Sequence, residues 1–542
     1  MQMRRLAGKV IARNGVQLLV FTPGDSSLLA LKVVPDASEP SHPSEQSDSS
    51  DCLTRLWHDE TALQSVLQAM VPELLQKDSS TSPSHNAECG VSTNKPLPAP
   101  LNAAVLSTAW NTFEPHVSAL NLNLTEKCNL ACVYCYARGG DYQRIHSDMT
   151  PETAVKGLEE ALRNADPKRL FRIEFFGGEP LLNPSTIQAV LEAQERSSLW
   201  RNWPGGTQNR ISTNLTVCDD QRVELVRRGK MIVSISLDGT ASAQNDQRPF
   251  KDGRGSYEII MDNIRKLRKA CPDHVFVARM TAYRHDEHLL EMVSTFASSE
   301  LFDYVSIYPA AISKAGDANQ GDSHFSTPFR EAILGVAGEY QRLVKAGGRF
   351  KGFLELNRLC ADILTGRVAL NHCRAGAGYF TLSPDGSVHP CHRLIGDTSW
   401  DLKHLNVGTP EIVSRLAPWR TTVDERSGCL ACELRYLCGG GCKQQARLSS
   451  HDLLGNDKNI CAWADLLFEA ALTVCANRSP EVDERLGASF AELDRLFVFC
   501  GRESIANGRR LALLPEQISV ASSAFHTGKI SLRPSWVTLE PL

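Results

Sequence analysis

Six short apolar segments alternate with helical segments between residues 118 and 310, and this alternation limits the folds open to the chain. The expected strands lie at 119–125, 172–177, 210–215, 231–239, 275–282 and 304–310. Units of one strand and one helix at this length favour parallel strands covered by their helices. We therefore expect an α/β fold in which six strands curl into a barrel or partial barrel.

The clearest helix in this region begins at Pro151. Thr150 suits the N-cap, proline suits the first helical position, and Ala154, Leu158 and Leu162 recur on one face. A second helix is predicted over residues 256–270.

Polar or glycine-rich motifs follow the first four strands directly. CNLACVYC (128–135) follows the first strand and GGEP (177–180) the second, while STN (212–214) and SLDG (236–239) end the third and fourth. Functional residues of parallel barrels lie at the carboxyl ends of the strands, so we expect these motifs to meet at one rim.

Three cysteines, Cys128, Cys132 and Cys135, fall within eight residues, and no fourth cysteine follows nearby. Thiolates at this spacing suit iron–sulfur ligation, and a four-iron cluster held by three of them keeps one iron free for another ligand. The triplet alone leaves a zinc site open as the alternative, with its fourth ligand from elsewhere in the chain.

CNLACVYCY, FFGGEPLLN and SLDG together resemble the radical S-adenosylmethionine (SAM) enzymes. The resemblance implies that SAM occupies the free iron and is split reductively into a 5′-deoxyadenosyl radical. For the two glycines of GGEP, we expect that the missing side chain lets the backbone approach SAM closely. The implied SAM contacts are Tyr134, Gly177, Gly178, Glu179, Pro180, Ser212, Thr213, Asn214, Ser236, Asp238 and Arg279.

Seven further cysteines follow between residues 373 and 461, and such clustering in a large chain points to metal or cluster ligands. Their order resembles the SPASM extension of radical SAM enzymes, which implies two auxiliary four-iron clusters. A pair of zinc sites is the alternative, but it would need eight ligands. By the resemblance, one cluster is bound by Cys373, Cys391 and Cys442, and the other by Cys429, Cys432, Cys438 and Cys461.

The first of these auxiliary sets is one ligand short. Relatives with a closed cluster carry another cysteine a few residues before the position of Cys373, whereas ILTGRVALNH (363–372) contains none. Cys360 or, less usually, His372 could complete the set. We favour an open cluster that can bind a substrate thiolate or carboxylate, and either form gives an electron an exit from a substrate radical.

Two polar tracts, 35–51 and 77–100, separate the amino-terminal part from the rest. Strands are predicted before residue 35 and a helix over 53–76. We expect a β-rich and helical module at 1–100, a barrel at 112–345, a SPASM domain at 346–475 and an extension at 476–542 with a helix over 489–499. The first module either binds a leader peptide as an added strand or is a family-specific embellishment.

Composition restricts the partners of the chain. A formal net charge of −4 and a pI near 6.4 argue against a general nucleic-acid or membrane-surface binder. No apolar run is long enough to cross a bilayer, and charged residues interrupt any signal-peptide core. We expect a cytoplasmic protein.

FFGGEPLLN, QRPFKDGRGSYE, CRAGAGYFTLSPDGSVHPCHRLIGD and CGGGC look most like peptide and protein maturases, including thioether-forming enzymes and the maturase of the quinohemoprotein amine dehydrogenase small subunit. The resemblance implies cross-linking of a precursor polypeptide, with flavodoxin or ferredoxin as electron donor. The alternatives are an anaerobic sulfatase-maturase that forms formylglycine and a non-catalytic iron–sulfur carrier or scaffold. No residue can be named as the general base.

Overall fold

The structure is a computed structural model of the chain. It describes residues 7–12, 16–22, 27–33, 116–140, 142, 147–283, 289–310, 327–346, 348–365, 368–430, 432, 434–476, 492, 493, 496, 501–503 and 537–541. The helix predicted over 53–76 and the two polar tracts lie outside these residues, as does most of the helix predicted over 489–499.

The described part of the chain contains a curved sheet of nine strands in the order β10-β9-β8-β7-β6-β5-β4-β12-β13. Its six central strands are parallel, as predicted from the alternating pattern. They are β4 (Ala119–Asn123), β5 (Phe171–Phe176), β6 (Thr207–Thr213), β7 (Ile232–Ser236), β8 (Phe276–Ala282) and β9 (Tyr304–Pro309).

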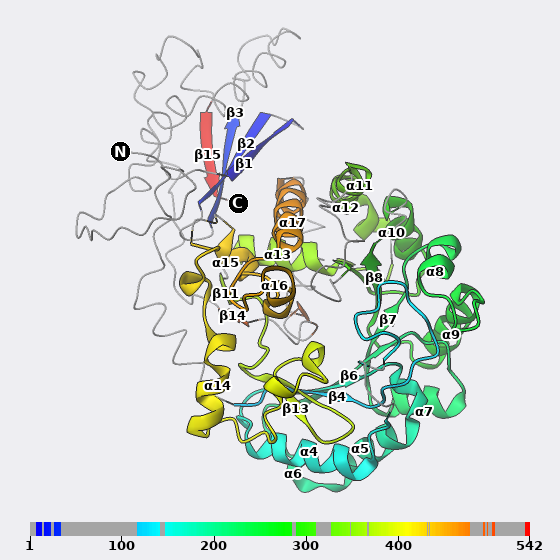
Figure 1. The fold of residues 1–542 in the computed structure, drawn as a ribbon. Coiled ribbons are helices and arrows are strands. Elements are labelled where there is room, and N and C mark those ends of the chain that lie inside the picture. Colours follow the sequence, from blue (N-terminus) through cyan, green and yellow to red (C-terminus); the bar gives the residue numbers. More distant parts are fainter. Residues whose placement is uncertain are drawn as a thin grey trace.

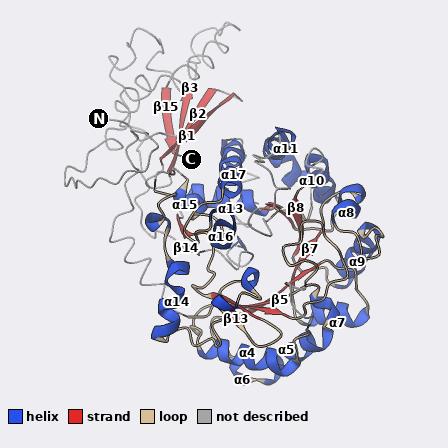
Figure 2. Ribbon diagram, in the orientation of Figure 1, coloured by secondary structure: helices blue, strands red, loops and turns tan. Residues whose placement is uncertain are grey.

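Helices cover the outer, convex side of this sheet (Figures 1 and 2). The predicted helix at 150–166 is confirmed: it spans Pro151–Arg163, and the hydroxyl of Thr150 accepts from the amide of Thr153. The outer helices are α4 (Pro151–Arg163), α5 (Pro184–Arg196), α6 (Ser198–Arg201), α7 (Asp220–Arg228), α8 (Ala241–Gln247), α9 (Tyr257–Ala270), α10 (Leu289–Ser298), α11 (Thr327–Gly338) and α12 (Tyr340–Ala346).

The two faces of the sheet differ in chemistry because side chains alternate along each strand. One face is apolar and packs against the helices; it includes Leu122, Phe175, Ile211, Val233 and Ala278. The opposite, concave face carries polar and charged side chains, among them Asn121, Glu174, Ser212, Ser234 and Arg279. A polar concave face is suited to binding a ligand inside the partial barrel.

The cysteine-rich region is not a separate layer, since it extends this same sheet. β12 (Tyr379–Leu382) pairs with β4 in parallel, and β13 (Val388–His389) pairs with β12. At the other edge β10 (Gly352–Phe353) pairs with β9. The sheet therefore crosses the domain boundary that we expect near residue 345.

Helices of the cysteine-rich region lie across the open side of the barrel (Figure 1). They are α13 (Leu354–Thr365), α14 (Pro410–Arg420), α15 (Arg435–Cys438), α16 (Lys443–Ser450) and α17 (Lys458–Ala476). The same region contains the short 3-10 turns η4 (His392–Leu394), η5 (Thr398–Trp400) and η6 (Val423–Glu425), whereas η2 (Pro180–Leu182) follows β5 in the barrel. The weak periodicity of the sequence at 370–470 did not predict these helices. Their side chains, such as Trp419 and Leu466, join the core of the barrel, so apolar packing also shapes this region.

The two ends of the chain meet in a second sheet. β1 (Ala7–Ala12), β2 (Val16–Thr22), β3 (Ser27–Val33) and β15 (Val537–Pro541) are antiparallel, in that order. β14 (Gly501–Glu503) pairs with β11 (Val368–Asn371). The extension at 476–542 thus contributes one strand to the amino-terminal sheet and one strand to the cysteine-rich region. None of the described helices is long and apolar enough to span a bilayer.

Candidate functional site

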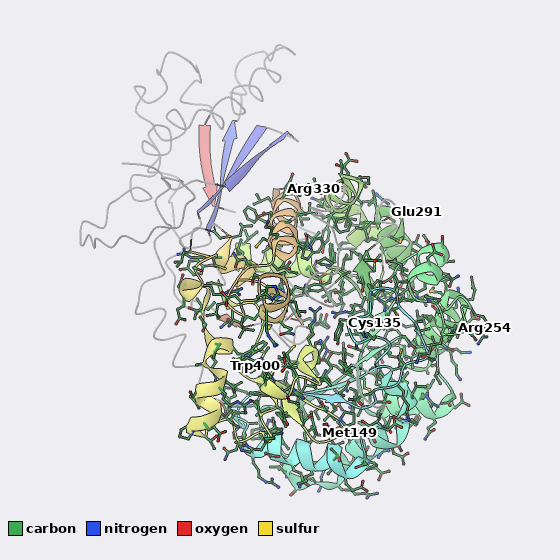
Figure 3. All side chains as sticks on the ribbon, viewed as in Figure 1. Cys135, Met149, Arg254, Glu291, Arg330 and Trp400 are labelled. Atoms are coloured by element: carbon green, nitrogen blue, oxygen red, sulfur yellow. The ribbon has the colours of Figure 1, made fainter. Side chains whose placement is uncertain are left out.

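The first three cysteines lie in a loop after β4, residues 128–135, which we call the cysteine loop. Its turns are closed by backbone bonds such as Cys135 N to Cys132 O at 3.1 Å. Burial raises the pKa of Cys128 to about 12 and that of Cys132 to about 11, and neighbouring thiols of the loop contribute to both shifts. Three thiols are therefore grouped on one short loop. Figure 3 shows one of these residues, Cys135, inside the ring of helices.

A neighbouring segment holds the backbone of the cysteine loop. Ala131 N donates to Pro249 O at 2.8 Å, Val133 N to Gln247 O at 3.0 Å, and Lys251 N to Asn129 O at 3.2 Å. Leu130 and Phe250 form an isolated antiparallel bridge. Because the loop has no helix or strand of its own, segment 247–251 provides its regular backbone partner.

The GGEP turn packs directly on the start of this loop. Gly178 N donates to Thr125 O at 2.8 Å and Glu179 N donates to Lys127 O at 2.9 Å. A Cβ on Gly177 would lie 2.6 Å from Thr125 O, and one on Gly178 would lie 2.2 Å from Lys127 O. Both glycines are therefore required by a close approach to the chain's own backbone, and the expected approach to SAM stays a prediction.

Glu179 links the ends of β5 and β6. Its carboxylate accepts from Thr213 Oγ1 at 2.6 Å, from Asn214 N at 2.6 Å and from Leu181 N at 3.1 Å. Burial raises the pKa of Glu179 to about 7, although these donors act in the opposite direction. The side chain is 1% exposed, so it acts as an internal connection within the rim.

Asn214 connects this rim to the first cysteine. Its side-chain amide donates to Asn129 Oδ1 at 3.0 Å and lies 3.6 Å from Cys128 Sγ. Ser212, two residues before Asn214 and on the concave face, donates to Glu174 Oε1 at 3.1 Å. The STN motif thus contacts both the cysteine loop and the concave face.

Asp238, in the SLDG motif, is bound by several groups of the chain. Arg248 donates to both carboxylate oxygens at 2.9 Å, Thr281 N donates at 2.9 Å, and the hydroxyl of Tyr134 donates as well. The guanidinium of Arg248 lies 5.2 Å from the centre of the Tyr134 ring. The polar groups of Tyr134 and Asp238 are thus engaged with each other and with Arg248.

Arg279 lies on β8 in register with Ser236 of β7. Its side chain is exposed on the concave face, and its guanidinium lies 5.5 Å from the centre of the Tyr308 ring. Burial lowers the pKa of the His392 imidazole to about 3, and the positive charges of Arg393 and Arg279 contribute to this shift. Arg279 therefore lies close to His392. This arginine is available to an anionic group inside the barrel.

The later cysteines form two groups. Burial raises the pKa of Cys391 to about 12, and the nearby thiols of Cys442 and Cys373 contribute to this shift. Cys461 is exposed as a residue, yet burial of its thiol raises its pKa to about 12, helped by three nearby thiols. Those three belong to Cys438, Cys432 and Cys429.

The two residues that could complete the first group lie in different surroundings. The thiol of Cys360 donates to Ala471 O of α17 at 3.8 Å and lies near the hydroxyl of Tyr340. His372 Nδ1 lies 3.1 Å from the carbonyl oxygen of Cys438, which belongs to the second group. Cys360 is thus part of the helix packing.

These groups fit iron–sulfur clusters by the chemistry of their donors. Soft thiolates are the usual ligands of such clusters, and binding would remove the protons that burial retains on the free thiols. No three His, Cys, Asp or Glu side chains among the described residues are close enough to hold one metal ion. A four-iron cluster does not need this arrangement, because each iron takes its own thiolate.

Aromatic side chains join the cysteine loop to the first later group. Tyr136 follows Cys135, His392 follows Cys391, and their ring centres lie 5.9 Å apart. The His392 ring also lies 4.8 Å from that of Phe176, and Tyr379 Oη is 3.0 Å from His392 Nδ1. One cluster of aromatic side chains therefore connects the two cysteine regions.

Sequence reasoning missed Arg248 and His392 as parts of the site. Arg248 lies in QRPFKDGRGSYE, a stretch that resembles a family segment, but nothing in the letters shows that it bonds Asp238. His392 follows a predicted cluster ligand directly, and only the three-dimensional arrangement brings its ring to Phe176.

Comparison with known proteins agrees with this geometry. A profile of the radical SAM superfamily matches residues 122–296, which include the cysteine loop and the GGEP and SLDG motifs. A serine-type anaerobic sulfatase-maturating enzyme of Klebsiella aerogenes is 23% identical over 343 residues, covering 60% of this chain and 80% of that protein.

Two further proteins resemble this chain at comparable identity and coverage. A PqqA peptide cyclase of Rhodopseudomonas palustris is 23% identical over 387 residues, covering 69% of this chain and 94% of that protein. The solved structure of anSMEcpe with bound AdoMet matches with a TM-score of 0.56 at 19% identity, covering 69% of this chain and 99% of that one. This structural match shows a shared fold.

Proposed function

Since this chain is a radical SAM enzyme, we propose that it installs an oxidative cross-link, such as a thioether, in a precursor peptide or small protein. The names of two relatives, a sulfatase-maturating enzyme and a PqqA peptide cyclase, support a polypeptide substrate. The polar concave face offers room for polar contacts with such a chain.

The cysteine loop would bind the four-iron cluster that, with SAM, supplies a 5′-deoxyadenosyl radical able to remove a substrate hydrogen atom. The protein's part is to position and enclose this chemistry. Glu179 and Asp238 tie the strand ends that carry the loop, and the helices seal the outer face of the sheet.

Joining a thiol sulfur to a carbon atom removes two hydrogen atoms from the substrate. One leaves as a hydrogen atom to the deoxyadenosyl fragment. The other leaves as a proton to water or a base and as an electron, which needs an acceptor. We assign the acceptor role to auxiliary four-iron clusters at the two later cysteine groups, one at Cys373, Cys391 and Cys442 and the other at Cys429, Cys432, Cys438 and Cys461.

One observation carries this assignment: the 5.9 Å contact between the rings of Tyr136 and His392. Each ring directly follows a cysteine, one of the cysteine loop and one of the first later group. An electron acceptor held by Cys391 would therefore lie beside the place where the substrate radical forms.

Formylglycine formation is the second candidate, and the similarity to sulfatase-maturating enzymes favours it. A Bacteroides thetaiotaomicron enzyme of that name is 31% identical over 147 residues. Against it, the thiol of Cys360 donates to Ala471 O of α17, which supports a first later group of three cysteines among the residues that the structure describes. An incompletely ligated cluster could bind the substrate thiol that a thioether requires.

The test uses the anaerobically purified full chain, with dithionite and SAM. Formation of 5′-deoxyadenosine identifies an active enzyme, whereas iron and sulfide without SAM cleavage would indicate a scaffold. If a short reading frame lies beside the gene, co-expression with it then identifies the product. A cross-link blocks fragmentation between two residues in tandem mass spectrometry, whereas formylglycine reacts with a hydrazide probe.

A further inference from the structure

We propose that Arg248 is the positioning residue that fixes the cysteine loop against the barrel rim and thereby sets the geometry of the SAM site. The inference rests on the proposed radical SAM reaction. It adds a residue that the resemblance did not assign, and it gives Asp238 of the SLDG motif a structural role.

The backbone on both sides of Arg248 pairs with the cysteine loop. Gln247 O accepts from Val133 N at 3.0 Å, and Pro249 O accepts from Ala131 N at 2.8 Å. A shift of the backbone at Arg248 would therefore displace the two hydrogen bonds that Ala131 and Val133 of the cysteine loop make with it. The loop depends on this ladder because it has no regular structure of its own.

The side chain of Arg248 ties that ladder to two strand ends. Its Nε and Nη2 donate to the two carboxylate oxygens of Asp238, after β7, at 2.9 Å each. Nη2 also donates to Thr281 Oγ1, on β8, at 3.1 Å. Arginine can do this because its planar fork matches a carboxylate with two parallel bonds, which a lysine ammonium cannot copy.

The same aspartate reaches the cysteine loop a second time through Tyr134. The Tyr134 hydroxyl donates to Asp238 Oδ2, and the guanidinium of Arg248 lies 5.2 Å from the centre of its ring. Tyr134 lies between Cys132 and Cys135. Arg248 thus holds the loop from its backbone and from its side chain, with the Arg248 and Asp238 side chains only 9% and 1% exposed.

Arg268 provides a matched control. It is also buried, donates to an aspartate (Asp303, 2.8 Å) and lies over an aromatic ring (Phe276, 3.7 Å). Its remaining bonds go to carbonyl groups such as Leu301 O, near the starts of β8 and β9. Both arginines should support folding, but only Arg248 should affect the SAM site.

The experiment compares wild-type holoenzyme with Arg248→Gln, Arg248→Lys, Tyr134→Phe and Arg268→Gln. Each protein is assayed for iron, for melting temperature, for the change in the reduced-cluster EPR spectrum on adding SAM, and for the SAM dependence of 5′-deoxyadenosine formation. The EPR change on adding SAM reports the cluster whose free iron would bind SAM, and it is independent of turnover.

We expect Arg248→Gln to bind iron but to lose the SAM-induced EPR change and to raise KM for SAM tenfold or more. Arg248→Lys and Tyr134→Phe should show smaller changes of the same kind. Arg268→Gln should lower the melting temperature while keeping the EPR change and KM. If Arg248→Gln does not fold, the two milder variants decide by the same readouts.

The proposal is overturned if the Arg248 and Tyr134 variants keep the wild-type EPR change and KM, or if Arg268→Gln alters them equally. These outcomes differ from a failure of the proposed function, which would appear as a wild-type protein that does not cleave SAM.

Discussion

The backbone amide of Glu179 donates to the carbonyl oxygen of Lys127 at 2.9 Å, so the turn after β5 is bonded to the residue before the first cysteine. This bond places the two backbones so close that position 178 has no room for a side chain. The GGEP turn is therefore a support for the cysteine loop.

Gly178→Ala tests this support. The new Cβ would lie 2.2 Å from Lys127 O and must displace backbone, so we expect a loss of stability of about 2 kcal/mol or more. Iron bound by the cysteine loop should fall with it. Differential scanning fluorimetry and iron analysis measure both effects.

Gly408→Ala is the control, since a Cβ at Gly408 meets nothing within 4 Å. It should melt and bind iron as wild type does. A Gly178→Ala protein with wild-type melting temperature and iron content would show that the two backbones can separate at little cost.

Replacing Cys128, Cys132 and Cys135 together by Ala should abolish 5′-deoxyadenosine formation. The later cysteine groups lie on other segments, so their iron should stay bound. Iron and sulfide analysis of the anaerobic protein checks this. SAM cleavage by the triple variant would refute the assignment of the loop.

Cys360 and Cys391 should behave differently on substitution by Ala. Cys360 packs between helices, with its thiol toward Ala471 O, so its loss should lower stability by about 1 kcal/mol through lost packing and leave iron content unchanged. Cys391→Ala should remove up to one four-iron cluster. Equal iron loss in both variants would mean that Cys360 is a ligand.

The sequence predicted the barrel well because its cues are local. Alternating apolar segments identified the six central parallel strands, and the cap at Thr150 identified α4. The helices at 410–476 were missed: α14 contains Pro418, and α15 and α16 have only four and eight residues, too few for a clear periodicity. Sheet edges were missed too: the pairing of β12 with β4 joins residues about 260 apart, which no local pattern encodes.

In the candidate site, too, the features with local sequence cues were predicted and those that depend on distant segments were not. Spacing alone drew attention to the cysteines, whereas the partners that hold them come from distant segments. Arg248 reaches Asp238 and the cysteine loop only through the turn that follows α8. The contact of Gly178 with the backbone of Lys127 was not predicted, because a sequence shows that a side chain is absent but not which neighbour requires its absence.

Glu179 should make stability depend on pH in a direction unusual for a carboxylate. Burial raises its pKa from the ordinary 4.5 to about 7, so the folded chain keeps a proton that the unfolded chain has released between these values. The stability that this proton contributes is complete below pH 4.5 and is lost as pH rises through about 7. At about 1.4 kcal/mol per pKa unit, the loss is about 3 kcal/mol.

The measurement is the difference in unfolding midpoint between wild type and Glu179→Gln from pH 4.5 to 8, because the difference removes the contribution of other groups. Glu179→Gln should show a weaker decline with rising pH. Glu195→Gln serves as the opposite case: hydrogen bonding from Arg228 lowers the pKa of the exposed Glu195, so its small contribution is lost as pH falls. A Glu179→Gln profile parallel to wild type would mean that the buried carboxylate stays ionised, held by Thr213 and the amide of Asn214.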